Sequence, residues 1–181
     1  IDINNQVLKS INKVTILKDA IDISIKSYTD NGSFRNDNSV HVGRASILKM
    51  IELMHSDLAA ETIENLQNDY FFLYLLHSRR FLLNNCLKDL EDMFNKNILD
   101  KAIKQLDRSI VCWKSFYYIV SKSAMKPDPQ ICKKVNKLLE KILFVEDELI
   151  KVLSNLNIQE MDNTTGRGVY EYKSTNQLHI E

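Results

Sequence analysis

The chain has 181 residues but only four glycines and two prolines, too few turn formers for a sandwich or barrel in which every hairpin needs its own turn. Its 24 basic and 24 acidic residues balance, so no overall charge steers it towards nucleic acid or an anionic membrane. No apolar run reaches the roughly 18 residues of a transmembrane helix, so no membrane span is predicted. This composition favours a few long helices.

The first predicted helix covers residues 2–28, where apolar residues recur every three or four positions. Turn-forming residues end it at Gly32, and the polar residues 33–38 follow as a loop. A second helix is predicted from Ser39 or Arg44. Residues 55–57 and 68–69 both offer helix caps, and the helix-forming residues 59–61 favour a single break at 67–69. The apolar stripe of this second helix is Ile47, Leu48, Ile51, Met54 and Leu58.

A third helix is predicted over residues 70–94, and the short connection at 95–97 implies that a fourth helix runs antiparallel to it. Pro127 and Pro129 separate the fourth helix from a fifth. Apolar residues recur with a sustained period of 3.5 residues in these two helices, which favours packing them against each other at a crossing angle of about +20°. Their stripes are Leu99, Ile103, Leu106, Ile110, Trp113, Tyr117, Val120 and Ala124, then Val135, Leu138, Ile142, Val145, Leu149, Val152 and Leu156.

These elements predict an all-α fold, an elongated antiparallel bundle of four to five long helices. The bundle domain is expected to cover residues 1–156. Residues 157–181 are polar and are expected to form a flexible tail. Within that tail, Val169, Tyr170 and Tyr172 form an alternating motif that could add a strand to the sheet of a partner.

Few residues are arranged for catalysis or metal binding. Three widely spaced cysteines, Cys86, Cys112 and Cys132, are interpreted as small core residues in a reducing compartment, and the expected location is the cytoplasm. Glu52 and His55 form one copy of the pair that a di-iron bundle needs twice. The sequence contains no phosphate loop, dinucleotide fingerprint or serine-nucleophile motif. We therefore expect no cofactor, no metal and no enzymatic activity.

Two groups of carboxylates, one near the end of the third helix and one in the fifth, are interpreted as parts of solvated helix faces. Neither group has the histidine partners of a bundle metal site. Their members are Asp89, Glu91, Asp92, Glu146, Asp147 and Glu148.

His77, Arg79 and Arg80 interrupt the apolar third helix. One interpretation is a phosphoryl-accepting histidine with basic neighbours, which gives a helical sensory or histidine phosphotransfer module as an alternative function. Phe81 argues against it, since the partner of such a histidine needs a small residue there. The other interpretation places all three residues beside the core stripe, with the arginine stems covering apolar surface.

Charge is unevenly distributed along the chain. Residues 100–141 hold ten basic and four acidic residues, a net charge of +6 that the remainder balances. One interpretation is a basic face that binds nucleic acid or an acidic partner. The other is that these lysines flank the helix seam and pair with acids on neighbouring helices. The candidate binding residues are Lys101, Lys104, Arg108, Lys134, Lys137 and Lys141.

Long regular helices present extended surfaces with few convergent polar groups, which suits binding better than chemistry. The expected function is therefore a non-enzymatic protein–protein interaction module, such as an adaptor, scaffold or regulatory bundle. The expected partner is another protein. A second copy of the chain is an alternative, because the fourth and fifth helices can close their seams within one chain or between two.

Overall fold

The computed structural model describes residues 13–29, 42–91, 96–125 and 129–156. These ranges contain six helices and no strand, which confirms the all-α prediction. The helices are α1 (Lys13–Thr29), α2 (Gly43–Met54), α3 (Ala59–Asn68), α4 (Tyr70–Leu90), α5 (Lys96–Met125) and α6 (Ile131–Ser154).

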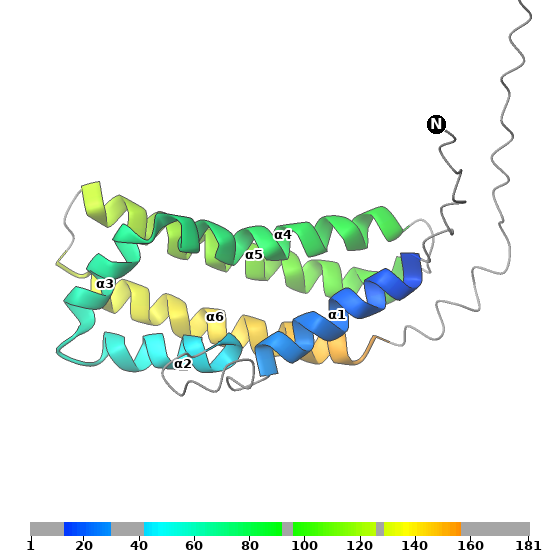
Figure 1. Ribbon diagram of the computed structural model, residues 1–181, viewed down its shortest axis with the longest axis horizontal. Coiled ribbons are helices and arrows are strands. Elements are labelled where there is room, and N and C mark those ends of the chain that lie inside the picture. Colours follow the sequence, from blue (N-terminus) through cyan, green and yellow to red (C-terminus); the bar gives the residue numbers. More distant parts are fainter. Residues whose placement is uncertain (1–12, 30–41, 92–95, 126–128, 157–181) are drawn as a thin grey trace, which may run out of the picture.

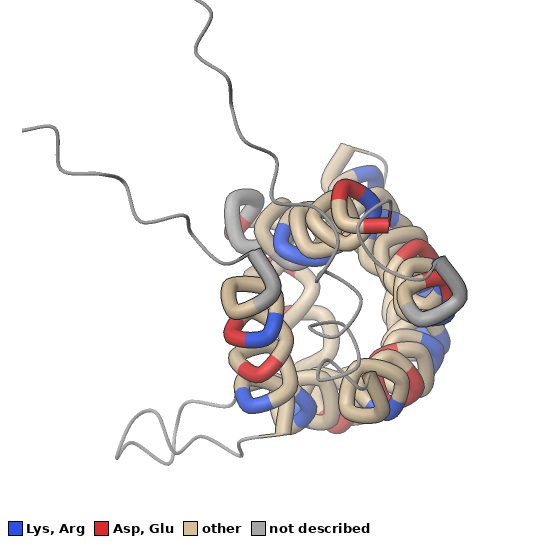
Figure 2. The backbone as a smooth tube through the Cα atoms, turned by 90° about the vertical axis from the view of Figure 1, so that its right-hand side faces the viewer, with Lys and Arg blue, Asp and Glu red and all other residues tan. Residues whose placement is uncertain are grey.

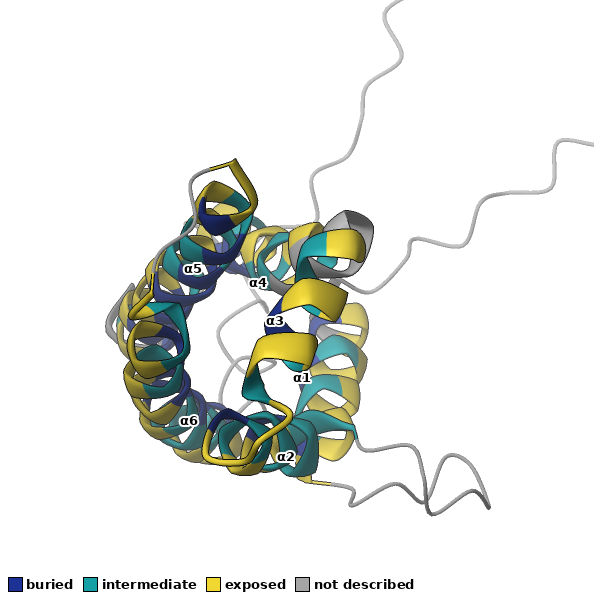
Figure 3. Ribbon diagram, turned by 90° about the vertical axis from the view of Figure 1, so that its left-hand side faces the viewer, coloured by how far each residue is buried: buried dark blue, intermediate teal, exposed yellow. Residues whose placement is uncertain are grey.

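Helices α5 and α6, with 30 and 24 residues, form the antiparallel pair on which the others assemble. Helix α4 packs along α5, and α2 packs along α6. Helices α1 and α3 lie at opposite ends of the bundle, on the side of the bundle away from α5 and α6 (Figure 1). Viewed end-on, α5 and α6 therefore occupy one side of the bundle, with α4 and α2 flanking them (Figure 3).

The predicted second helix is two helices, so the preference for a single break at residues 67–69 was wrong. The helix is interrupted at residues 55–58 and again at Asp69. At the first break, the Ser56 hydroxyl donates to the Leu53 carbonyl (2.8 Å) and accepts from the Leu58 N–H (3.2 Å). Such local bonds replace helical ones and end the helix. The helices before α5 are consequently shorter and more numerous than predicted, and residues 1–12 lie outside the described ranges.

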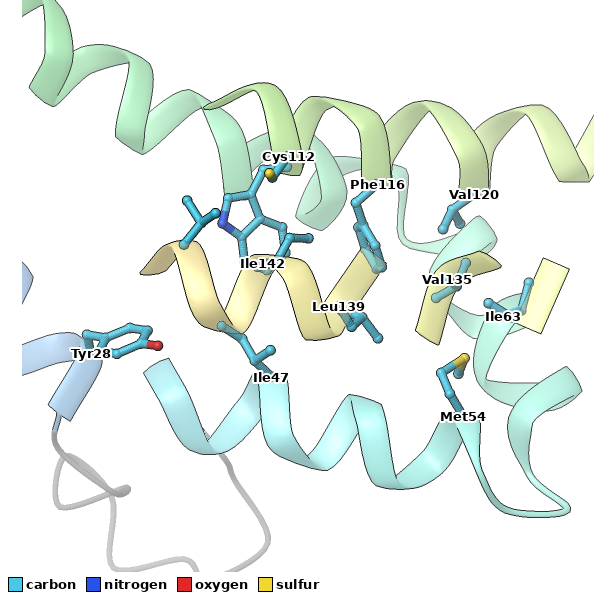
Figure 4. Packing of buried hydrophobic residues seen from close by; sticks show 12 residues of the cluster. Tyr28, Ile47, Met54, Ile63, Cys112, Phe116, Val120, Val135, Leu139 and Ile142 are labelled. Atoms are coloured by element: carbon cyan, nitrogen blue, oxygen red, sulfur yellow. The ribbon is translucent and has the colours of Figure 1, made fainter. Parts of the chain in front are cut away.

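The buried core runs along the inner sides of α5 and α6 in two clusters. One cluster joins Leu99 and Leu153 to residues of α1 and α4, while the other surrounds Trp113, Phe116 and Leu139. Figure 4 shows Phe116 extending from α5 towards α6, and Leu139 on the side of α6 that faces α2, within the second cluster. Neither residue belongs to a predicted stripe. A stripe one residue wide underestimates how much of the helix surface is buried when the helix packs against several neighbours.

Three positions assigned to the stripes are exposed instead. Leu48 on α2 and Ala124 near the end of α5 face solvent, and Leu58 lies in the break before α3. Leu58 was placed on the assumption of one continuous helix, and the break changes the direction of the chain, so a stripe drawn through it does not stay on one face. Leu48 lies within α2 beside the buried Ile47, and adjacent residues of a helix point in different directions.

A buried carboxylate joins α4, α5 and α6. The side chain of Glu146 is 3% exposed, and its Oε1 accepts hydrogen bonds from Arg80 Nε (2.5 Å), Ser109 Oγ (2.5 Å) and Trp113 Nε1 (2.7 Å). The Arg80 guanidinium also lies over the Trp113 indole, 4.9 Å from the ring centroid. The prediction of a solvated Glu146 was therefore wrong. Spaced four residues after the buried Ile142, Glu146 belongs to the inner side of α6.

The adjacent residue on α6 ties in two further helices. The Asp147 carboxylate accepts two hydrogen bonds from Arg44 of α2 (2.9 and 3.1 Å) and one from the Tyr28 hydroxyl of α1 (2.7 Å). Burial alone would raise the pKa of Asp147, but the Arg44 and Tyr28 hydrogen bonds outweigh it and hold that pKa below its ordinary value. Burial, together with the hydrogen bond to Asp147, raises the pKa of Tyr28.

Gly43 begins α2 where this helix meets the end of α1. Its φ is +56°, in the left-handed region that glycine adopts most readily. A Cβ at this position would lie 2.4 Å from the Ser27 carbonyl oxygen and 2.5 Å from the Tyr28 carbonyl oxygen. The contact between the two helices therefore requires glycine both for backbone conformation and for space.

Gly43→Ala should lower the free energy of unfolding by roughly 2–4 kcal/mol, because alanine meets both the strained φ and the carbonyl contacts. Urea denaturation followed by circular dichroism measures the change. Ala60→Ser, at an exposed position of α3, is the control and should change stability by about 0.5 kcal/mol or less. Equal stability of Gly43→Ala and the wild type would contradict this contact.

Arg80→Ala should destabilise the protein by about 3–5 kcal/mol, because Glu146 would remain buried with only neutral donors. Replacing both residues with methionine should cost less than the two single replacements together, since no buried charge is left. Arg79→Ala, at the exposed neighbouring arginine, is the matched control and should be nearly neutral. Equal losses for Arg79→Ala and Arg80→Ala in urea denaturation would show that the buried pair is unimportant.

Candidate interaction surface

The structure separates the three residues His77, Arg79 and Arg80. Arg79 is exposed, whereas Arg80 points inward to Glu146. The His77 ring is half-buried between the rings of Tyr74 and Tyr117, at centroid distances of 5.3 and 5.9 Å. Its Nδ1 is buried and has no hydrogen-bond partner within the part of the chain that is described. A phosphoryl group at His77 would therefore not find both arginines beside it.

The outer face of α5 and α6 is the side turned away from the other four helices. Buried positions of both helices face the inside of the bundle and exposed positions face outward (Figure 3). All six basic residues predicted as binding residues on these helices are exposed: Lys101, Lys104, Arg108, Lys134, Lys137 and Lys141. Further exposed members of the face are Val111, Lys114, Tyr118, Lys122 and Met125 of α5, and Lys133, Phe144 and Lys151 of α6.

Two apolar residues lie level with each other on this face. Ser109 bonds Glu146 across the antiparallel pair, which fixes the register of α5 against α6. Two residues further along α5 is Val111, and two residues back along α6 is Phe144. These side chains are 61% and 64% exposed, so both project outward rather than into the core.

More apolar surface continues along α5 from Val111. Tyr118 follows one heptad later with 60% of its surface exposed, and Met125 follows another heptad later with 83%. The prediction from the sequence missed Val111, Tyr118, Met125 and Phe144, because it traced only the stripes that pack inward. The missed signal is a second series of steps of three and four residues on the opposite side of each helix.

The middle of the outer face is strongly basic. Residues 108–125 contain no acidic residue, and residues 131–145 contain only Glu140, whose carboxylate accepts a hydrogen bond from Asn136 (3.0 Å). The Lys122 ammonium lies over the Tyr118 ring, 5.5 Å from its centroid. The end-on view shows both basic and acidic residues on the helices of this side, so the basic section is identified from the residue ranges (Figure 2). The cations of this section are Arg108, Lys114, Lys122, Lys133, Lys134, Lys137 and Lys141.

Ion pairs occur towards the ends of the face. Lys104 pairs with Asp100 (2.6 Å) and Lys151 pairs with Glu148 (2.7 Å), each within its own helix. Pairs of this exposed kind contribute little to stability. These two lysines therefore do not connect α5 to α6, in contrast to the interpretation that the lysines pair with neighbouring helices.

The remaining predicted sites offer less. Glu52 pairs with Lys49 (2.7 Å), and the described residues contain no group of three or more His, Cys, Asp or Glu suited to a metal ion. The tail motif Val169, Tyr170 and Tyr172 lies outside the described residues. No helix in the described ranges is long and apolar enough to cross a membrane.

The cysteine prediction is confirmed only in part. Cys112 is buried, and burial raises the pKa of its thiol, whereas Cys132 is half-buried and Cys86 is exposed. All three are free thiols. A shallow depression between α2 and α3 is lined by Leu53, Leu66 and three polar residues. It brings together no titratable pair that would suggest catalysis.

Phe144→Ala should change the free energy of unfolding by less than about 1 kcal/mol, because most of the ring is already in water. Phe116→Ala, at the fully buried phenylalanine of α5, should cost about 3–5 kcal/mol. Urea denaturation of the two variants gives the comparison. A loss at Phe144 as large as that at Phe116 would mean that this aromatic ring serves the fold and is not available at the surface.

Comparison of the chain with known protein families, curated proteins and solved structures finds no match. The function proposed for this chain consequently rests on its own side chains and their arrangement.

Proposed function

We propose that this chain is a non-enzymatic protein-binding module and that the outer face of α5 and α6 is its binding surface. The observation that carries the proposal is the level pair of exposed apolar side chains, Val111 and Phe144, within a basic surround. Protein interfaces likewise have an apolar centre surrounded by a polar rim. Three free cysteines suit a reducing compartment, so we assign the module to the cytoplasm.

The arrangement favours a protein over nucleic acid as partner. Nucleic acid is bound mainly through contacts to its phosphate groups, and the exposed apolar side chains of Val111 and Met125 cannot provide such contacts. Arg108 is the single arginine among the cations in the middle of the face, although arginine is the residue that best grips phosphate with two hydrogen bonds. The basic residues nevertheless make nucleic acid the alternative that an experiment must separate.

The histidine phosphotransfer alternative draws less support. Arg80, one of the two basic residues that would hold an incoming phosphoryl group, instead satisfies the buried Glu146. Removing it from that role would leave a buried charge unpaired, which is costly. His77 itself remains a candidate only through its second ring nitrogen, because Nδ1 is buried.

The test is affinity capture from an extract of the cells that make the protein, after nuclease treatment, followed by mass spectrometry. The outer-face variant carries Val111→Ser and Phe144→Ser. The matched control carries Phe81→Ser and Leu82→Ser, two similarly exposed apolar residues on α4. We expect a protein that the wild type and the control retain in stoichiometric amount and that the outer-face variant loses at least tenfold.

Three outcomes would overturn the proposal. They are retention by all three forms alike, loss of every partner after nuclease treatment, and no retained protein at all. Circular dichroism of each form before capture ensures that a lost partner is not the result of a lost fold.

A further inference from the structure

We propose that the partner segment on the outer face is a single acidic amphipathic α-helix, lying along the seam between α5 and α6. This inference rests on the proposed function and specifies the chemistry of the occupant. The occupant presents large apolar residues to Val111, Tyr118 and Phe144, and glutamate or aspartate to the cations on both sides.

The exposed residues of the outer face form one series along α5 and another along α6. Their extent and spacing indicate the length and the secondary structure of the partner segment. On α5 it runs from Lys104 to Met125 and on α6 from Lys134 to Lys151, spans of about 32 and 26 Å at 1.5 Å per residue. The α5 series steps by three and four residues throughout, and the α6 series does so from Lys134 to Phe144, with Lys151 one heptad further on. This is the spacing that a helix presents to a neighbouring parallel or antiparallel helix. A surface this long and narrow fits one helix of roughly 18–21 residues.

The apolar residues set where the occupant must be apolar. Val111 and Phe144 lie level on the two sides of the seam, and Tyr118 lies one heptad, about 10 Å, along α5. A helix with large apolar side chains one heptad apart can cover both positions at once. Interface energy concentrates at such central apolar and aromatic contacts.

The charges flanking these anchors set the sign of the occupant. Arg108 precedes Val111 by three residues and Lys141 precedes Phe144 by three, so each anchor has a cation one turn away on its own helix. Seven cations and one acid occupy residues 108–125 and 131–145 together. Acidic residues flanking the apolar stripe of the partner would complement both rows of cations.

The same charges argue against a second copy of this chain on the face. Two outer faces brought together would place the rows of cations of one chain against those of the other. Like charges opposed in an interface cost several kcal/mol, so self-association through this face is disfavoured.

The test measures binding of a defined fluorescent peptide to the full chain by anisotropy. The peptide has three heptads, with leucine at positions a and d and glutamate at e and g. Its controls are the same residues in shuffled order and a 20-base-pair DNA duplex. We expect the amphipathic peptide to bind at least tenfold more tightly than the shuffled one, and to become helical on binding.

Variants of the protein locate the binding. Val111→Ser with Phe144→Ser, and separately Lys137→Glu with Lys141→Glu, should each weaken binding of the amphipathic peptide at least tenfold. Phe81→Ser with Leu82→Ser on α4 should leave it unchanged. Equal binding of the shuffled peptide, tighter binding of the DNA duplex, or indifference to the outer-face variants would overturn the acidic-helix proposal.

The result also separates this inference from the function on which it rests. If the peptide fails to bind while a cellular protein is still captured through Val111 and Phe144, the acidic helix is wrong and the protein-binding function stands. If neither the peptide nor any protein depends on these residues, both proposals fall.

Discussion

Two neighbouring carboxylates on α6 contact four of the other five described helices. Glu146 accepts hydrogen bonds from Arg80 of α4 and from α5, while Asp147 accepts them from Tyr28 of α1 and Arg44 of α2. Apolar packing is compatible with many small shifts of one helix along another, but a buried carboxylate is satisfied only where its donors converge. These two residues therefore give the bundle its register, while the apolar clusters on either side supply most of the burial.

This arrangement divides α5 and α6 into two sides with different roles. The inner sides carry Trp113, Phe116 and Leu139, together with the polar partners of Glu146. The outer sides carry residues that lie mostly in solvent, among them Val111 and Phe144. These exposed apolar side chains within a basic surface are the basis of our proposal that this face binds a partner.

Sequence periodicity predicted the all-α class, the long pair α5 and α6 and the antiparallel order, because each depends on local spacing and turn residues. It did not predict that Glu146 is buried, since a carboxylate is placed inside only when an arginine from a distant helix meets it. It placed a helix break correctly at Asp69 but did not favour the second candidate at residues 55–57, where the local Ser56 hydrogen bonds compete with good helix formers. The basic candidates of the outer face were identifiable by charge, whereas its apolar anchors were hidden by attention to the inward stripes.

Glu146 couples α4 to the α5–α6 pair, and native-state hydrogen exchange of the wild type and of Glu146→Gln measures this coupling. In the wild type, amides in the central turns of α4, α5 and α6 should open together at the highest free energy in the molecule. In Glu146→Gln, the α4 amides should open at a lower free energy than those of α5 and α6, because the charged partner of Arg80 is gone. An α4 that already opens independently in the wild type, or that exchanges unchanged in the variant, would show that Glu146 does not couple these helices.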